Sequence, residues 1–248
     1  AIISKSSVFS RYDMLSLPVV DKEERLVGII TIDDAVDVMQ EANTEDFEMM
    51  AGIAHSDDTY LKMPVVSLAK NRIIWLLVLM FSAMITGAML EHYEAAIATL
   101  PLLVSFIPML MDTGGNCGSQ ASTMIIRGMA LDEIEPSDFL RVWWKEIRVA
   151  LLCGGTLSVV NFVRIYLQYN VLAAEPNPDC VRIAAVVSLT LIATVCIAKS
   201  LGCILPMLAK KLKLDPALMA APMITTVTDA CSILVFFSLA LTILRDRL

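Results

Sequence analysis

Five long apolar stretches constrain this sequence most, because each is long enough to cross the hydrocarbon core of a membrane. They cover residues 73–90, 94–111, 147–169, 181–208 and 217–244. A helix needs about 20 mainly apolar residues to span a core of about 30 Å. Hydrophobic residues make up 57% of the chain, against roughly 45–50% in soluble proteins. The expected fold class is therefore an all-α polytopic membrane domain with five transmembrane helices in a lipid bilayer.

Lysine and arginine in the connecting segments predict the orientation of these spans. Positive charges precede the first span, lie between the second and third, and lie between the fourth and fifth. The alternate connections contain few of them. Because positively charged loops stay on the cytoplasmic side, we expect a cytoplasmic N-terminus and an external C-terminus, in a bacterial-type inner membrane.

The residues before the first span carry almost all of the net charge. Residues 1–72 contain 7 Lys and Arg against 13 Asp and Glu, a net charge of −6 out of −7 for the whole chain. Nucleic-acid binding requires a basic surface, so no nucleic-acid partner is expected. An acidic segment is suited to cations, although solvated surface charge is the other interpretation.

Two short β-branched runs, residues 17–20 and 26–30, flank the polar segment 21–25, which predicts two strands joined by a turn. A helix capped by Thr31 is expected next. The stretch Leu-Val-Gly-Ile-Ile-Thr-Ile-Asp-Asp at residues 26–34 resembles the closing strand and helix of a CBS domain. We therefore expect residues 1–53 to form the C-terminal part of a CBS domain pair, a partial α/β cytoplasmic domain whose remainder precedes this sequence. A further helix is expected to run from about Pro64 into the membrane.

Asp229 is the most informative residue of the fifth span. It lies about 12 residues, or roughly 18 Å, inside a helix expected to begin near Ala217, and so close to the bilayer midplane. A charge there costs roughly 2.5–3.5 kcal/mol or more, and should face a polar path or a partner. Thr225, Thr228 and Ser232 extend a polar stripe on the same helix face. A hydrogen-bonded contact between two helices is the alternative.

The segment 112–122, Asp-Thr-Gly-Gly-Asn-Cys-Gly-Ser-Gln-Ala-Ser, places three glycines among polar side chains at membrane depth. Pro101 and Pro108 precede it, and we expect irregular backbone here. Such backbone is tolerated only where it lines a cavity or is buried in protein. Asn116 and its neighbours would supply oxygen ligands to such a cavity, while a tight polar corner between two helices is the other interpretation.

Three segments resemble the MgtE family of magnesium channels in their order and spacing, namely residues 112–120, 210–217 and 222–229. The resemblance implies a homodimer whose pore runs between the protomers. It implies that Asp229 of each subunit binds the ion, that the backbone oxygen of Thr225 faces the same ion, and that residues 54–72 form a connecting, plug-type helix ahead of a pore domain over residues 73–248. The candidate pore-lining residues are Asn116, Thr228 and Ser232. Magnesium suits this assignment, because proteins tend to hold it through one or two carboxylates while it keeps several waters.

The family resemblance also implies gating by cytoplasmic Mg²⁺, which would thus be both transported and regulatory. By position, the candidate regulatory ligands are Asp13, Asp34, Asp37, Glu45 and Asp46, and charge alone adds Asp57 and Asp58. Each is also typical of solvated surface. The pair Thr31 and Asp34 matches the pattern by which many CBS domains hold an adenosine ribose, which makes ATP a candidate ligand. The same two residues can cap a helix.

Three other functions are weighed against the channel. One is a membrane-anchored metal or nucleotide sensor without flux, and another is an anion channel bearing a CBS domain. The third is an intramembrane aspartyl protease using Asp112 and Asp229, which would make the chain an enzyme, and we expect that it is not one. Lys199, a base inside the fourth span, is expected to pair with a carboxylate such as Asp112 or to reach toward an interface.

Overall fold

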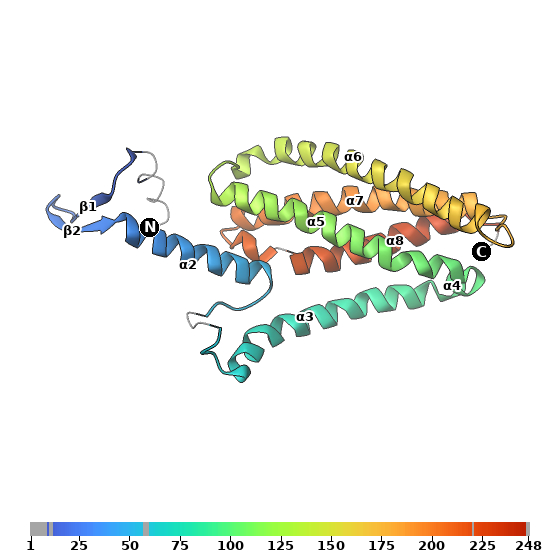
Figure 1. Ribbon diagram of the computed structural model, residues 1–248, viewed down its shortest axis with the longest axis horizontal. Coiled ribbons are helices and arrows are strands. Elements are labelled where there is room, and N and C mark those ends of the chain that lie inside the picture. The colour runs from blue at the N-terminus through green and yellow to red at the C-terminus, as the bar shows by residue number, and fades with distance from the viewer. Residues whose placement is uncertain (1–8, 10–11, 57–59, 220, 247–248) are drawn as a thin grey trace. The chain divides into compact units, whose positions relative to one another are not determined.

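The computed structural model describes residues 9, 12–56, 60–219 and 221–246, and the chain forms two compact units, residues 1–49 and 50–248. The first unit holds a small strand pair, and the second holds long apolar helices (Figure 1). The predicted fold class, a helical membrane domain with a partial α/β domain before it, is confirmed.

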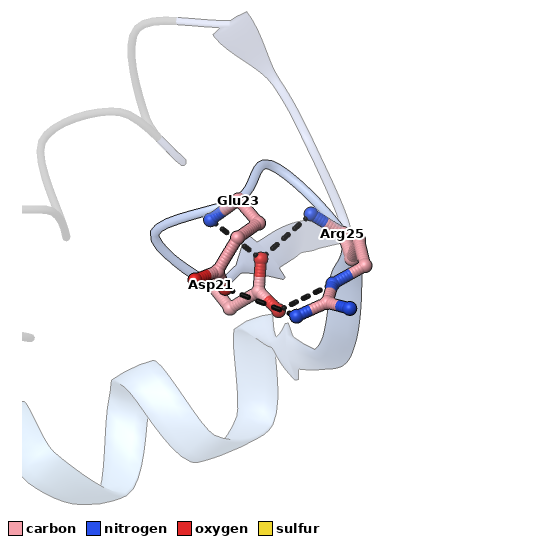
Figure 2. A network of polar contacts seen from close by, with 3 residues as sticks. All are labelled: Asp21, Glu23 and Arg25. Carbon is pink, nitrogen blue, oxygen red and sulfur yellow. Dashed lines mark hydrogen bonds and ion pairs between the residues drawn. The ribbon is translucent and has the colours of Figure 1, made fainter.

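The strand pair of the first unit is a hairpin. Strands β1 (Ser16–Val20) and β2 (Leu26–Thr31) are antiparallel, with Ser16 opposite Thr31, and agree with the predicted strands to within one residue. Figure 2 shows the connecting turn, where one carboxylate oxygen of Asp21 accepts the backbone N–H groups of Glu23 and Arg25 at 2.9 and 2.8 Å. The Arg25 guanidinium donates to Asp21 and Glu23, each at 3.0 Å. These bonds fix the turn and thereby the register of the hairpin.

Helix α2 (Ile32–Met50) follows β2 directly, and Thr31 caps it as predicted. The Asp34 backbone N–H donates to the Thr31 hydroxyl oxygen at 3.4 Å, and the Thr31 hydroxyl and backbone N–H donate to the Asp34 carboxylate at 2.6 and 3.0 Å. This reciprocal arrangement satisfies backbone donors that the first helical turn cannot pair internally.

In the second unit, α3 (Val65–His92) begins directly after Pro64, as expected. The second predicted span, 94–111, is placed differently. Its residues are divided among α4 (Glu94–Thr99), the 3-10 helix η1 (Pro101–Phe106) and the first turn of α5 (Ile107–Ala130). Proline inside a helix removes a backbone hydrogen bond and clashes with the preceding turn, whereas it is accepted in a first turn. Pro101 and Pro108 accordingly lie in the first turns of η1 and α5 rather than inside one continuous span.

After the short 3-10 helix η2 (Pro136–Asp138), α6 (Phe139–Tyr166) continues into the π-helix η3 (Leu167–Val171). Helix α7 (Cys180–Lys211), the 3-10 helix η4 (Pro216–Met219) and α8 (Ala221–Ile243) complete the unit. Within the described residues, four helical stretches are long and apolar enough to cross a membrane: Val65–His92, Pro136–Val171, Cys180–Lys211 and Pro222–Ile243. Helix α5 lies among them but carries the polar segment 112–122, which lowers its hydropathy.

Helix α7 is central to the packing, since it contacts α5, α6 and α8, and α5 also contacts α8. The main core joins α5, α7 and α8 through fully buried side chains including Leu110, Val187 and Phe237. Helix α3 packs against α8 and otherwise exposes large apolar side chains such as Ile74, Phe81 and Met84. That surface is suited to lipid or to another protein surface rather than to water.

Candidate ion-binding site

Asp229 is the ninth residue of the 23-residue helix α8 and so lies near its middle. Its side chain is half-buried, and it has no hydrogen bond or ion pair within the described residues. The Asp112 carboxylate on the neighbouring helix α5 is close enough for its charge to act on Asp229. Two carboxylates near one another in a membrane-embedded helix pair make a region of concentrated negative charge, which a cation would stabilise.

Thr225 lies one turn before Asp229 and is also half-buried. Its hydroxyl donates to the Pro222 carbonyl at 2.9 Å, while its methyl group packs against Gly115 of α5. The side chain is therefore engaged within the protein. In a regular helix the carbonyl of residue 225 accepts the amide of residue 229, and a carbonyl oxygen has a second lone pair for another ligand.

The other two polar residues of the stripe on α8 are buried inside the protomer. Thr228 and Ser232 face Gly114 of α5, where an added Cβ would lie 2.7 Å from the Thr228 methyl group and 3.4 Å from the Ser232 hydroxyl. The Ser232 hydroxyl donates to the Thr228 carbonyl at 2.7 Å. Within this protomer, both side chains thus belong to the contact between α5 and α8.

The predicted irregular backbone at residues 112–122 was wrong, because this segment lies inside the continuous helix α5. Its glycines serve close packing instead. A Cβ at Gly115 would lie 2.8 Å from the Thr225 methyl group, and one at Gly118 would lie 3.1 Å from the Ala198 carbonyl.

With this glycine face turned toward α7 and α8, the remaining polar side chains occupy another face of α5. Asp112, Asn116 and Gln120 are exposed there, and Ser119 is half-buried. Asn116 is thus the one exposed member of the three predicted pore-lining residues.

Most of the predicted regulatory carboxylates belong to the first unit, residues 1–49. Asp13 is exposed with a left-handed backbone (φ 50°), Asp37 and Glu45 are exposed on α2, and Asp46 is half-buried there. Asp57 and Asp58 lie outside the described residues. Among the residues described, no three His, Cys, Asp or Glu side chains gather closely enough to hold a metal ion. Their regulatory role stays a prediction.

The Thr31 and Asp34 pair forms the cap of α2 described above. The Thr31 hydroxyl and backbone N–H beside Asp34 hold the pKa of that carboxyl below its usual value. The side-chain oxygens that the sequence pattern offers to a ribose are thus engaged in the cap, and ATP binding stays a prediction.

Sequence reasoning did not identify the partner of Lys199. Lys199 of α7 is 5% exposed, and its ammonium group donates to Glu146 of α6 at 3.3 Å. Next to it, the Trp143 indole donates to the Ser200 hydroxyl at 3.2 Å. Glu146 directly precedes the predicted span 147–169, and this position is the sequence signal that could have identified it as a partner. Because this lysine is neutralised within the protein, it leaves Asp112 without a basic partner.

Comparison with known proteins assigns both parts of the chain. Residues 107–239 match the family model MgtE, described as divalent cation transporter, and residues 6–41 match the CBS domain. The chain is 35% identical over 92% of its length to the magnesium transporter MgtE of Thermus thermophilus, and 33% identical over 94% to that of Bacillus subtilis. It spans about half the length of these relatives, 49% of each. This is a family of transporters rather than enzymes, so the intramembrane protease is set aside. The chain belongs to the MgtE family of divalent cation transporters and is a multi-pass membrane protein with a CBS-type segment.

Proposed function

We propose that this chain forms the ion-conducting part of a magnesium-selective channel. The observation that carries the proposal is Asp229, a half-buried carboxylate at the middle of a membrane helix, without a hydrogen-bond or ion-pair partner among the described residues. Such a group is costly unless it faces a polar path or a cation. Mg²⁺ gives up its water reluctantly and is suited to one or two carboxylates with waters between. The magnesium transporters to which the chain is similar support this choice of ion.

We propose that the pore lies between two protomers of a homodimer. Asp229 of each copy would then supply one of two facing carboxylates, with the Thr225 carbonyl and the exposed Asn116 beside them. In a dimer the polar face of α5 would line water rather than lipid, which accounts for its polar character. The positive charges flanking the helices support a cytoplasmic N-terminus and an external C-terminus.

Uptake of Mg²⁺ into proteoliposomes loaded with a magnesium-sensitive dye tests the proposal directly. Asp229→Asn and Asp229→Ala should each lower flux by roughly tenfold or more, since losing about 1.4 kcal/mol of ion stabilisation is already tenfold. Glu175→Gln is the matched control, because Glu175 is exposed in the segment before α7. Unchanged flux in both Asp229 variants would assign this residue to packing. No flux in any variant, despite a folded protein, would favour the sensor without flux.

The acidic N-terminal segment supports gating by cytoplasmic Mg²⁺ as part of the proposal. Bound cations would relieve repulsion between carboxylates and bring the soluble segments together. Flux should then fall as Mg²⁺ rises on the cytoplasmic face. A variant with Asp37→Asn and Glu45→Gln together should require more Mg²⁺ for the same inhibition, while its flux at low Mg²⁺ stays unchanged.

A further inference from the structure

Arg164 is a positive charge inside a predicted span that the ion path does not account for. It lies in α6, five residues before the end of the predicted span 147–169, which corresponds to about 7.5 Å of helix. Its side chain is exposed, and no carboxylate among the described residues pairs with it. An unpaired charge at the edge of the hydrocarbon core is costly. We therefore expect an anion from outside the protomer to lie beside it.

Neighbouring side chains hold the Arg164 guanidinium group in place. It donates to the Asn161 amide oxygen from Nε at 3.1 Å and from Nη2 at 3.0 Å, and to the Gln168 amide oxygen from Nη1 at 3.2 Å. Its central carbon lies 5.9 Å from the centre of the Phe106 ring of η1, which is within the range of a cation–π contact. Asn161 and Phe106 are buried, so the interior of the protein positions this charged group.

The same contacts leave the charge of Arg164 and two of its donors available. Both acceptors are neutral amide oxygens, so neither of them compensates the charge. A guanidinium group has five N–H donors, and these bonds leave one on each Nη atom. Two donors on one planar group match two oxygens of a phosphate. Because the group is already held, binding an anion costs little further side-chain entropy.

The surface of α6 beside Arg164 is apolar on the side toward the middle of the span. Val159, Val160 and Val163 are 65%, 63% and 50% exposed. Val160 lies one helical turn before Arg164 on the same face. A small soluble anion would leave these side chains uncovered, whereas a lipid would cover them with its acyl chains. The combination of a charged group and an adjacent apolar surface therefore favours a phospholipid.

We propose that Arg164 binds the phosphate group of an anionic phospholipid, whose acyl chains lie along Val159, Val160 and Val163. Phospholipid phosphates lie just outside the hydrocarbon core, within reach of a long arginine side chain near the end of a span. An anionic lipid is favoured over a zwitterionic one because no amine in its headgroup offsets the phosphate charge. The site holds α6 next to η1, which leads directly into α5. Bound lipid should therefore stabilise this end of the helical unit.

Native mass spectrometry of the full chain in detergent tests the site, with phosphatidylglycerol as the anionic lipid and phosphatidylcholine as the zwitterionic one. Arg164→Gln should weaken binding of the first phosphatidylglycerol roughly tenfold, which corresponds to about 1.4 kcal/mol. Arg164→Lys should weaken it less, since lysine keeps the charge but loses the planar group. The matched control is Arg182→Gln, because Arg182 near the start of α7 is also exposed but lies 3.9 Å from Asp246. It should bind the lipid as the wild type does.

Thermal unfolding gives a second measurement. Phosphatidylglycerol should raise the melting temperature of the wild type and of Arg182→Gln more than that of Arg164→Gln. Both measurements report lipid binding rather than flux, so their outcome is independent of whether the chain conducts Mg²⁺.

Three results would overturn the inference. Equal phosphatidylglycerol binding by Arg164→Gln and wild type would place the lipid elsewhere. Competition by glycerol 3-phosphate, which has the phosphate without acyl chains, would assign the site to a soluble anion. Loss of association between copies of the chain in Arg164→Gln, seen in the same spectra, would mean that a second copy supplies the anion.

Discussion

Gly202 of α7 lies directly against the backbone carbonyl of Gly118 of α5, closer than any residue with a Cβ could approach. A Cβ at position 202 would also lie 3.0 Å from the Ala121 Cβ and 3.1 Å from the Ser122 amide nitrogen. Backbone atoms cannot move aside as a flexible side chain can. Contact between these two helices therefore depends on glycine at both positions, as in the close helix pairs of membrane proteins.

Gly202→Ala should separate α5 from α7 and destabilise the protein. Overpacking of this kind costs about 1–3 kcal/mol, and we expect the upper half of that range because the clash is with backbone. Thermal unfolding in detergent, followed by the loss of monodisperse protein on heating, measures it. Gly155→Ala is the matched control, since a Cβ at Gly155 of α6 meets nothing within 4 Å. Equal melting temperatures of the two variants would contradict the packing described.

Lys199→Met should destabilise the protein more than any exposed charge change, because it leaves Glu146 partly buried without its partner. Breaking a buried pair costs roughly 3–5 kcal/mol, whereas replacing both partners by apolar residues is often close to neutral. The double variant Lys199→Met, Glu146→Leu should therefore be more stable than Lys199→Met alone. Thermal unfolding of the two single variants and the double variant measures the coupling. Additive effects would show that the 3.3 Å contact carries no energy.

Two serines join α6 to α7 by reciprocal hydrogen bonds. The Ser158 hydroxyl donates to the Ser188 carbonyl at 2.7 Å, and the Ser188 hydroxyl donates to the Ser158 carbonyl at 3.2 Å. Ser158→Ala should cost only about 0.6 kcal/mol, the average for such bonds in membrane helices. Ser119→Ala serves as control in the same unfolding assay, because the Ser119 hydroxyl donates within its own helix to Gly115 at 2.8 Å. If Ser158→Ala lowered the stability as much as Lys199→Met does, the small energy expected for this hydrogen bond would be contradicted.

The Asp34 cap should make α2 sensitive to acid. Hydrogen bonds from Thr31 lower the pKa of the Asp34 carboxyl in the folded state. A lowered folded pKa means that the cap stabilises the fold fully above the unfolded pKa of about 3.9, and that this contribution is lost as the pH falls through the lower folded pKa. Asp34→Asn should accordingly increase pepsin cleavage within residues 26–40 at pH values above about 4, and the difference from wild type should vanish in stronger acid.

Asp33→Asn controls for the loss of charge in this experiment. Asp33 is exposed in the same first turn of α2 and interacts with the helix N-terminus through its charge alone. Fragments identified by mass spectrometry give the cleavage rates. Equal cleavage of the Asp33 and Asp34 variants at every pH would mean that the two hydrogen bonds to Asp34 contribute nothing.

Local patterns in the sequence predicted the hairpin, the cap of α2 and the start of α3. Each depends on neighbours along the chain: β-branched runs around a polar turn, Thr31 with Asp34, and Pro64 at the first turn of a helix. Asp229 was identified for a similar reason, because a carboxylate within an apolar stretch is unusual whatever surrounds it.

The features that the sequence did not predict depend on packing between residues far apart in the chain. The glycines of residues 114–118 suggested irregular backbone, but they lie in a regular helix because Thr225, Thr228 and Ala198 approach them from α8 and α7. Thr228 and Ser232 share a face with Asp229 in sequence, yet their burial depends on where α5 lies. Likewise the pairing of Lys199 with Glu146 joins residues 53 positions apart. No local pattern contains that information.

Helix α3 packs against α8, the helix that carries Asp229. Helix α3 is a continuous rod of 28 residues, about 42 Å long, and a tilt imposed at its Pro64 end is transmitted along its whole length. Of the helices α5, α6, α7 and α8, α8 makes by far the most extensive contact with α3. On its other side, α8 is seated on the glycine face of α5. A displacement of α3 would therefore act directly on the helix that carries Asp229.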